Sequence, residues 1–342
     1  MTLILAQPSQ LPACERELRE MPIGPGHLRL ARQVVAAGGG VALDQLRSLP
    51  SWLSGAGPRQ GRDAEPGPER LEVPYGYDER LAEYDAYFGV GRAELATAGV
   101  VEHSMLVVYR SLLEEALSGG TRISWRQWSG LCAAFHEMLG LVTGVGVGAG
   151  PAPAAVPEPP LLRWHLDPDR RWRIGHHVFF ALTQGVIIAL SCFRQACADE
   201  DIDLAARMLR LATRLLAASA AAFVFTAEFS AAQYHAQVRP SMEPPGVSAG
   251  FSGLMSPDHH YLVKLLGVLR PQLRDLPSPL APAHRSFVMA MGTVYEAHKY
   301  VCARFGGDRS ASLRMSEAST VSAVEVIHGL KIARTKLVRS PR

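Results

Sequence analysis

Apolar residues recur every three or four positions along most of the chain after about residue 84. At this spacing they share one face of an α-helix, whereas a half-buried strand needs alternate residues to be apolar. The pattern predicts helices near residues 79–89, 92–118, 124–142, 174–198, 201–237, 257–269, 281–305 and 318–338. Alternation of the strand type is nearly absent from the same region. We therefore expect an all-α fold.

Proline and glycine divide the chain into two regions. Residues 1–75 contain stretches such as GAGPRQGRDAEPGPER, in which proline blocks a continuous helix and glycine raises the cost of order. We expect a Pro/Gly-rich N-terminal arm over residues 1–75 and an all-α domain over residues 76–342. Residues 143–160 are also rich in proline and glycine, which predicts a flexible loop within that domain.

The composition is that of a folded protein without a strong field of one sign. Of the 342 residues 48% are hydrophobic and 20% charged, which excludes disorder throughout the chain. The net charge of +3 is the balance of 35 basic and 32 acidic residues spread along the sequence, so we expect no nucleic-acid partner.

The sequence also gives expectations about the compartment. The N-terminus has no basic region before its short apolar run, so no signal peptide is predicted. The most apolar stretch, Val178–Phe193, is shorter than the ~20 residues that a spanning helix needs, so we interpret it as a core helix and expect no membrane. Five cysteines at uneven spacings suit reduced thiols. Together these features predict a cytoplasmic protein.

His298 and Cys302 are the residues with the most specific chemistry. They lie four positions apart in YEAHKYVCAR, which puts an imidazole and a thiol on one face of a helix, one turn apart. An imidazole can be the axial ligand of a heme iron, and a thiol one turn away could add to a heme vinyl group and form a thioether. The pair alone is weak evidence, because chance or half of a zinc site would produce the same spacing.

Two other classes of protein compete with a heme protein at this point. The first is a non-heme metal-binding helical protein that uses His103, His298 and carboxylates such as Glu102 and Glu296. The second is a helical binding module without any cofactor. No second HxxxC motif accompanies the first, which disfavours a zinc site.

The other histidines are less distinctive. His103 lies on an apolar stripe of GVVEHSMLVVYRSLLEEAL, where a histidine is more often a buried core residue than a catalyst. In each of the pairs His176/His177 and His259/His260, adjacent residues cannot share one helical face, and both pairs stand near a helix start. We expect surface or capping roles for these four residues.

Three segments, taken in their order along the chain, resemble the heme-dependent aromatic oxygenase superfamily, which includes tryptophan 2,3-dioxygenase. The helix bearing His103 resembles the family helix with the distal histidine. The segment YHAQVRPSMEPPGVSAGFSG resembles the family's substrate arginine, here Arg239, followed by its serine–glycine–phenylalanine loop, here 248–253. The helix with His298, followed by ARFGGDRSAS, resembles the helix of the proximal histidine. The resemblance covers roughly residues 85–335.

Within this superfamily, the motif HKYVC resembles the 3-methyltyrosine hydroxylases of tetrahydroisoquinoline antibiotic pathways. The resemblance implies a helical bundle that encloses a heme, with the catalytic domain at residues 76–342. It also implies the use of hydrogen peroxide to convert 3-methyl-L-tyrosine to 3-hydroxy-5-methyl-L-tyrosine. The implied roles are axial ligation by His298, covalent attachment through Cys302, acid–base catalysis by His103 and substrate binding by Arg239, Ser248, Gly250, Phe251 and Ser252.

Several points stay open at this stage. An L-tyrosine 3-hydroxylase of the same branch, which forms L-DOPA, is the alternative, because one ring methyl group is worth only ~1–3 kcal/mol of discrimination. The oxidant is peroxide, or oxygen with a reductant. The partners implied are a small aromatic amino acid and the oxidant, and we expect a homodimer.

Overall fold

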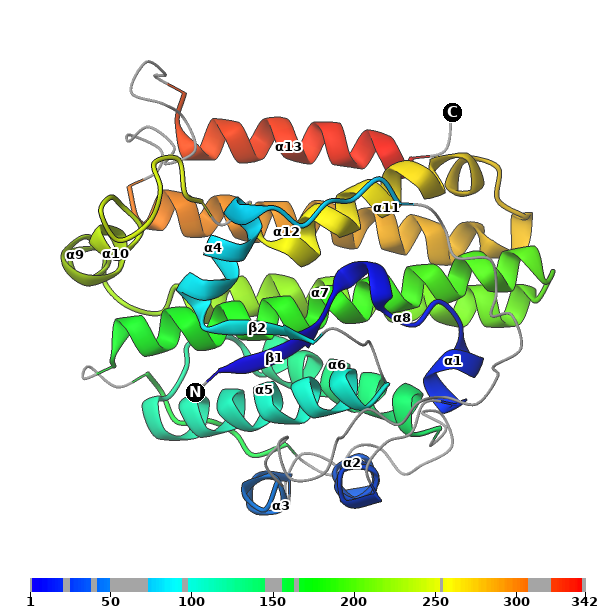
Figure 1. Cartoon of the computed structure of the whole chain (residues 1–342), viewed down its shortest axis with the longest axis horizontal. Helices are drawn as coiled ribbons and strands as arrows, with labels where there is room; N and C mark the ends of the chain where they lie inside the picture. Colours follow the sequence, from blue (N-terminus) through cyan, green and yellow to red (C-terminus); the bar gives the residue numbers. More distant parts are fainter. Residues whose placement is uncertain are drawn as a thin grey trace.

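Long helices stacked side by side make up most of the protein. The computed structural model describes residues 2–20, 25–37, 42–49, 73–93, 98–144, 156–162, 166–252, 255–306 and 321–339. Two central helices, α7 (Pro168–Ala198) and α8 (Ile202–Thr226), lie between α11 and α12 on one side and α5 and α6 on the other (Figure 1). Helix α13 covers α11 and α12. The all-α prediction is confirmed.

The helices predicted after residue 75 are all present, with shifted ends. They are α4 (Glu79–Phe88), α5 (Ala98–Gly119), α6 (Trp125–Thr143), α7, α8, α11 (Pro257–Arg274), α12 (Ala281–Arg304) and α13 (Ala323–Val338). Capping residues explain several starts. Ser124 and Gln127 form a reciprocal capping box at α6, and the Asp167 side chain accepts hydrogen bonds from two backbone amides of α7 just before Pro168.

The predicted helix over 201–237 ends early, at Thr226. Glu228 turns inward to an ion pair, and Ser230 then caps a new short helix, α9 (Ala231–Gln233). A π-helical turn (Tyr234–Val238) and α10 (Arg239–Ser241) follow. The apolar spacing continues through this region, so periodicity alone gave no sign of the break.

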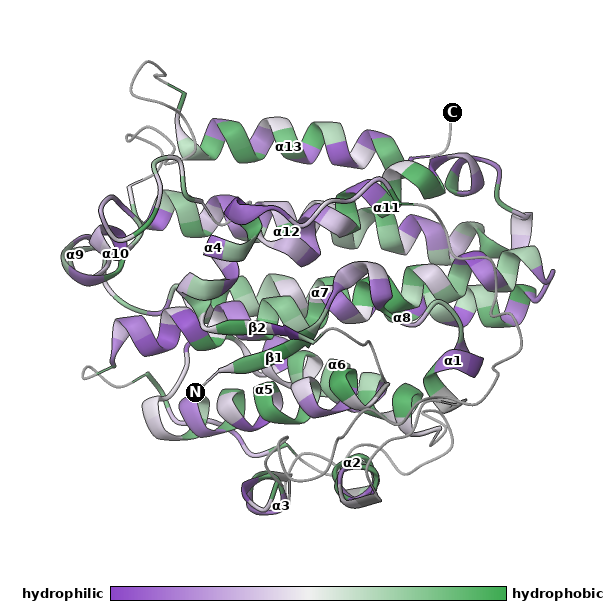
Figure 2. Cartoon of the chain, viewed as in Figure 1, coloured by the Kyte–Doolittle hydropathy of each residue, from purple (hydrophilic) through white to green (hydrophobic). Residues whose placement is uncertain are grey.

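Helices α7 and α8 form the centre of the core. A side chain at Gly175 of α7 would overlap Thr226 of α8, so glycine lets the two backbones approach closely. The hydrophobic colouring of both helices reflects this packing (Figure 2). Each contains an 18-residue window apolar enough to cross a membrane, but 78% of that window in α7 and 67% in α8 is buried inside the protein. This burial agrees with the prediction of a core helix over Val178–Phe193.

The N-terminal region differs from the predicted arm. Strand β1 (Leu3–Ala6) pairs in parallel with β2 (Val90–Ala93), and Leu3 and Leu5 are buried in the common hydrophobic core. Helices α1 (Glu15–Glu20), α2 (Pro25–Ala37) and α3 (Ala42–Arg47) also form here, and α2 packs on α5 and α6. The division into an arm and a domain stays a prediction, but these described parts of residues 1–75 belong to the body of the protein.

Two other predicted segments also differ from the structure. β2 replaces the start of the predicted helix over 92–118. The end of the predicted loop at 143–160 is held in place, because Trp128 Nε1 donates to Pro157 O (3.0 Å) and Thr121 N donates to Pro160 O (3.0 Å). Residues 145–155 of that loop lie outside the described residues.

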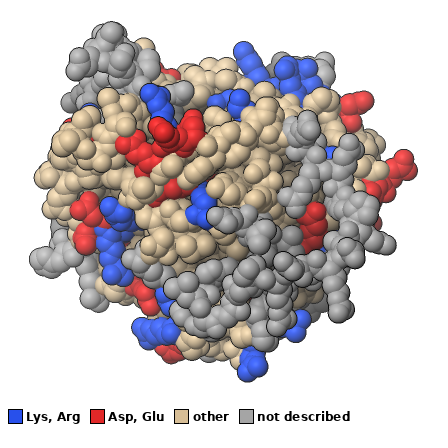
Figure 3. Space-filling model, viewed as in Figure 1, with Lys and Arg blue, Asp and Glu red and all other residues tan. Residues whose placement is uncertain are grey.

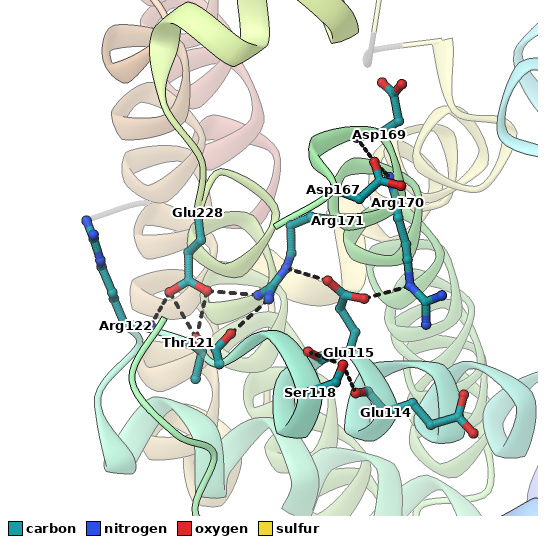
Figure 4. A network of polar contacts seen from close by, with 11 residues as sticks. Glu114, Glu115, Ser118, Thr121, Arg122, Asp167, Asp169, Arg170, Arg171 and Glu228 are labelled. Carbon is teal, nitrogen blue, oxygen red and sulfur yellow. Dashed lines mark hydrogen bonds and ion pairs between the residues drawn. The ribbon is translucent and has the colours of Figure 1, made fainter. Parts of the chain in front are cut away.

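A buried arginine joins three helices at one end of the bundle (Figure 4). The Arg171 guanidinium of α7 lies between Glu115 of α5 (3.2 Å) and Glu228 after α8 (3.0 Å), and it donates to Gly120 O at 2.8 Å. Its charge also lies 4.0 Å from the centre of the Phe225 ring. Each of its three nitrogens thus donates to a different acceptor, and its face lies on an aromatic ring, which fixes the relative positions of these helices.

We expect Arg171→Met to lower the free energy of unfolding by roughly 3–5 kcal/mol, because it leaves the buried Glu228 without its counter-charge and Glu115 with the exposed Arg170 alone. The matched control is Arg170→Gln, whose side chain also pairs with Glu115 but is 55% exposed. That exposed pair should be worth less than about 1 kcal/mol. Urea denaturation of the two variants measures both effects, and equal losses would contradict this account of the network.

Candidate active site

A mostly apolar cavity lies between α7, α8, α11 and α12. Its walls include Phe179 and Val186 of α7, Leu216 and Phe223 of α8, and Leu262 of α11. Three histidines, one cysteine and one arginine are the main polar groups on this surface: His176, His259, His298, Cys302 and Arg239. A concave apolar surface with a few polar groups that converge on it is typical of a binding site for a small molecule or cofactor.

The structure brings the predicted pair on α12 to this cavity. Both His298 and Cys302 line it, and the His298 ring stacks on Phe223 with 4.7 Å between ring centres. Burial lowers the pKa of His298 to about 4 and raises the pKa of the Cys302 thiol to about 11. At neutral pH the imidazole is therefore uncharged, with a nitrogen lone pair available, and the thiol is protonated.

Arg239 and Ser252 also line the cavity, as the substrate-binding prediction requires. Arg239 Nε donates to Glu243 Oε1 at 2.9 Å, one turn along the chain. This contact leaves the Nη groups of the guanidinium for another partner. The Ser252 hydroxyl is buried without a hydrogen bond to the described residues.

The rest of the predicted substrate loop lies outside the cavity wall. Ser248 is exposed, and both its amide and its hydroxyl donate to Glu83. Gly250 is exposed at a positive φ of 83°, which favours glycine there for conformational reasons. Phe251 is buried against Tyr84, with ring centres 5.5 Å apart, and so has a packing role. Residue 253 lies outside the described residues.

His103 does not lie at the cavity either. Its ring is buried between α5 and α2, where Nδ1 lies 3.1 Å from Nε2 of His27. The sequence places His103 on an apolar stripe of α5, a helix that packs on α2, α3, α6 and α7, and the contact with His27 shows that His103 faces α2. The predicted acid–base role of His103 therefore lacks the geometry that it requires.

Two histidines for which the sequence predicts surface or capping roles line the cavity instead. Burial lowers the pKa of both His176 and His259 to about 3. The Nδ1 atom of His176 lies 2.7 Å from Trp172 O, so this nitrogen donates its proton and Nε2 keeps its lone pair. The His259 ring makes no hydrogen bond with the described residues.

The sequence did contain a signal for these two histidines. His259, Leu262, Val263 and Leu266 follow each other at three- and four-residue spacing on α11, and all four line the cavity. On α7, His176 falls in the same way between Trp172 and Phe179. In each adjacent pair, only one histidine continues an apolar stripe, and this is the one that lines the cavity.

A buried ion pair positions His259. The preceding residue, Asp258, accepts hydrogen bonds from Arg92 Nη2 (2.9 Å) and Gln184 Nε2 (2.9 Å), and Arg92 also pairs with Asp85 at 2.7 Å. These contacts tie the start of α11 to β2 and to α7. The backbone that carries His259 is therefore held against the cavity from two sides.

The donor set of the cavity suits a heme better than a bare metal ion. Neutral imidazoles can ligate iron, and the apolar and aromatic walls would face a flat porphyrin. Among the described residues no group of three or more histidine, cysteine or acidic side chains could hold a metal ion. His103 lies away from His298, and Glu296 forms ion pairs with Lys299 and Lys331, so the non-heme alternative does not assemble.

In this all-α fold, uncharged imidazoles and a thiol line one apolar cavity. Helical oxidoreductases hold redox cofactors at sites of this kind. A family profile described as "SfmD 3-methyl-L-tyrosine peroxygenase" matches residues 4–285, and the chain belongs to this family. This membership confirms that the protein is an oxidoreductase, and it confirms the resemblance to the 3-methyltyrosine hydroxylases. The matched residues end before His298 and Cys302, so the profile does not bear on that pair.

Two known proteins are similar to this chain. The 3-methyl-L-tyrosine peroxygenase of Streptomyces lavendulae is 31% identical over 248 residues, which are 71% of this chain and 67% of that protein. The solved structure "Crystal structure of reduced SfmD by soaking with sodium hydrosulfite" matches with a TM-score of 0.65 and 25% identity. It covers 87% of this chain, and the match spans 96% of that chain.

A buried carboxyl group next to His103 makes the stability of the fold depend on pH. Glu102 is fully buried, neither of its oxygens has a hydrogen-bond partner among the described residues, and burial raises its pKa from 4.5 to about 8. Between these two pH values the folded protein keeps a proton that the unfolded chain releases. Glu102 therefore contributes a loss of stability that grows as the pH rises through this window.

We expect Glu102→Gln to remove this pH dependence, because glutamine has a similar shape and no charge. The variant should be more stable than the natural protein by roughly 1–3 kcal/mol at pH 8. The advantage should vanish near pH 4.5, and the matched control is Glu114→Gln on the same helix, where the side chain is only half-buried. Chemical denaturation between pH 4.5 and 8 measures these differences, and parallel profiles for Glu102→Gln and the natural protein would refute the assignment.

Proposed function

We propose that this protein is a heme-dependent peroxygenase that hydroxylates 3-methyl-L-tyrosine to 3-hydroxy-5-methyl-L-tyrosine in antibiotic biosynthesis. The observation that carries the proposal is the one-turn pair of His298 and Cys302 on the wall of an apolar cavity. Family membership supports the reaction and the substrate. The similar SfmD structure is of a protein reduced with sodium hydrosulfite, which supports a redox-active group in that relative.

His298 and Cys302 would hold the heme. The neutral imidazole of His298 could ligate the heme iron, and the Cys302 thiol could add to a vinyl group and form a thioether. When bound, the heme would supply the iron centre at which hydrogen peroxide delivers an oxygen atom to an aromatic ring. The protein supplies the binding, the orientation and the movement of protons.

His176 and His259 would take the acid–base role that the family resemblance implied for His103. Both rings are uncharged at neutral pH, so each can accept a proton from peroxide and return it to the departing oxygen. For His176 the accepting atom is Nε2, because Nδ1 faces Trp172 O. The pKa values of about 3 mean that neither base is lost by protonation at mildly acidic pH.

Arg239 and Ser252 would hold the amino-acid end of the substrate. The Nη groups of Arg239 can grip a carboxylate in a bidentate, charge-assisted contact, and the Ser252 hydroxyl has no other partner among the described residues. Close to Arg239, Tyr234 stacks on Phe305 with 4.2 Å between ring centres. This aromatic surface suits a phenol ring held in a fixed orientation.

The related function, 3-hydroxylation of L-tyrosine, uses the same residues and differs by one methyl group in the pocket. The Streptomyces lavendulae relative is a 3-methyl-L-tyrosine peroxygenase, which favours 3-methyl-L-tyrosine as the substrate. The cytoplasmic location and the homodimer stay predictions. The five cysteines are free in the structure, in agreement with a reducing compartment. Both signs of charge are interspersed on the face in Figure 3.

The proposed reaction is tested by incubating the purified protein with hydrogen peroxide and 3-methyl-L-tyrosine or L-tyrosine. We expect a mass gain of one oxygen, with a higher kcat/KM for the methylated substrate by roughly tenfold or more. His298→Ala should abolish product formation, while the exposed His328→Ala on α13 should leave it unchanged. If neither amino acid gains oxygen, the proposed function is wrong.

A further inference from the structure

A second cavity adjoins the first on the far side of His259. It lies between α11 and α13, and its polar lining consists of His259, His260, Lys264 and Arg334. His259 and Val263 line both cavities, so the two spaces adjoin each other along these side chains. A polar cavity thus lies directly beside the apolar one.

The cations of the second cavity lack an anion. Lys264 and Arg334 form no ion pair with a carboxylate among the described residues, and the Arg334 Nε atom is buried without a hydrogen-bond partner. The acidic group that acts on His260 is Asp78, whose carboxylate is engaged as the N-cap of α4 through Leu81 N (3.0 Å). A buried guanidinium nitrogen without an acceptor is costly, so this site favours an anionic ligand.

Cys302 and Arg334 lie toward opposite ends of α12 as seen from His298, although Arg334 itself belongs to α13. Cys302 is one turn after His298. Tyr295 is one turn before it, and the Arg334 charge acts directly on the Tyr295 hydroxyl, where it opposes the effect of burial on the pKa. A flat ligand centred at His298 that meets Cys302 at one edge therefore extends toward Arg334 at the other.

Protoheme has this polarity. Its vinyl groups lie on one edge of the porphyrin, and its two propionate carboxylates lie on the opposite edge. We propose that Arg334 and Lys264 bind the propionates of the heme and so fix which edge faces Cys302, an inference that rests on the proposed function. The planar guanidinium of Arg334 suits a bidentate contact with one carboxylate, while Lys264 acts as a mobile point charge near the exposed end of the cavity.

The test compares protoheme with its dimethyl ester, in which both propionates are neutral. The measurements use the full chain prepared without heme, both natural and with Cys302→Ala, because the latter makes binding reversible. We expect the Cys302→Ala protein to bind protoheme at least roughly tenfold more tightly than the ester. Adding Arg334→Gln and Lys264→Gln should remove this preference and leave the affinity for the ester unchanged, which also shows that the variant is folded.

Lys336→Gln, which removes an exposed cation of the same helix α13 outside the second cavity, is the matched control and should keep the preference. An unchanged preference in the Arg334/Lys264 variant would overturn the proposal. An unchanged preference with a raised KM for 3-methyl-L-tyrosine would overturn it too, and would assign the cations to the substrate carboxylate. If the natural protein binds neither porphyrin, the proposed function itself fails.

Discussion

The removal of three imidazoles from water is the physical effect on which the rest of the site depends. Transfer of a histidine into an apolar wall penalises its charged form, and this lowers the pKa to about 4 for His298 and about 3 for His176 and His259. At neutral pH each ring therefore keeps a nitrogen lone pair that can bind a metal or accept a proton. A cavity open to water would return these pKa values toward neutrality and put a proton in competition with the proposed iron.

The ionic networks hold the walls of this cavity without entering it. Arg92 fixes the start of α11, and Arg171 fixes α7 relative to α5 and to the end of α8. Arg304, two residues after Cys302, donates to Ala227 O (2.8 Å) and Phe229 O (3.0 Å), which ties the end of α12 to the chain that follows α8. Each arginine bridges elements distant in sequence, so the buried charges specify how the apolar helices are arranged.

The sequence predicted the helices and the His298–Cys302 pair because both depend on local spacing. It could not predict which neighbour each face would meet. His103 and His259 both lie on apolar stripes, yet His103 contacts His27 of α2 and His259 faces the cavity. Strand β1 was also missed, since the four residues Leu3–Ala6 are too few to show alternation and are stabilised by a partner almost ninety positions away. Tertiary packing decides such cases, and one sequence does not contain its outcome in readable form.

Covalent attachment at Cys302 is the most direct test of the account, because it requires the heme to occupy the cavity in the proposed orientation. The measurement is mass spectrometry of the peptide containing Cys302, after extraction of the purified protein with acidified organic solvent. The account predicts that this peptide carries the mass of heme and that Cys302→Ala releases the heme into the solvent. Complete extraction of heme from the natural protein, with an unmodified Cys302 peptide, would contradict it.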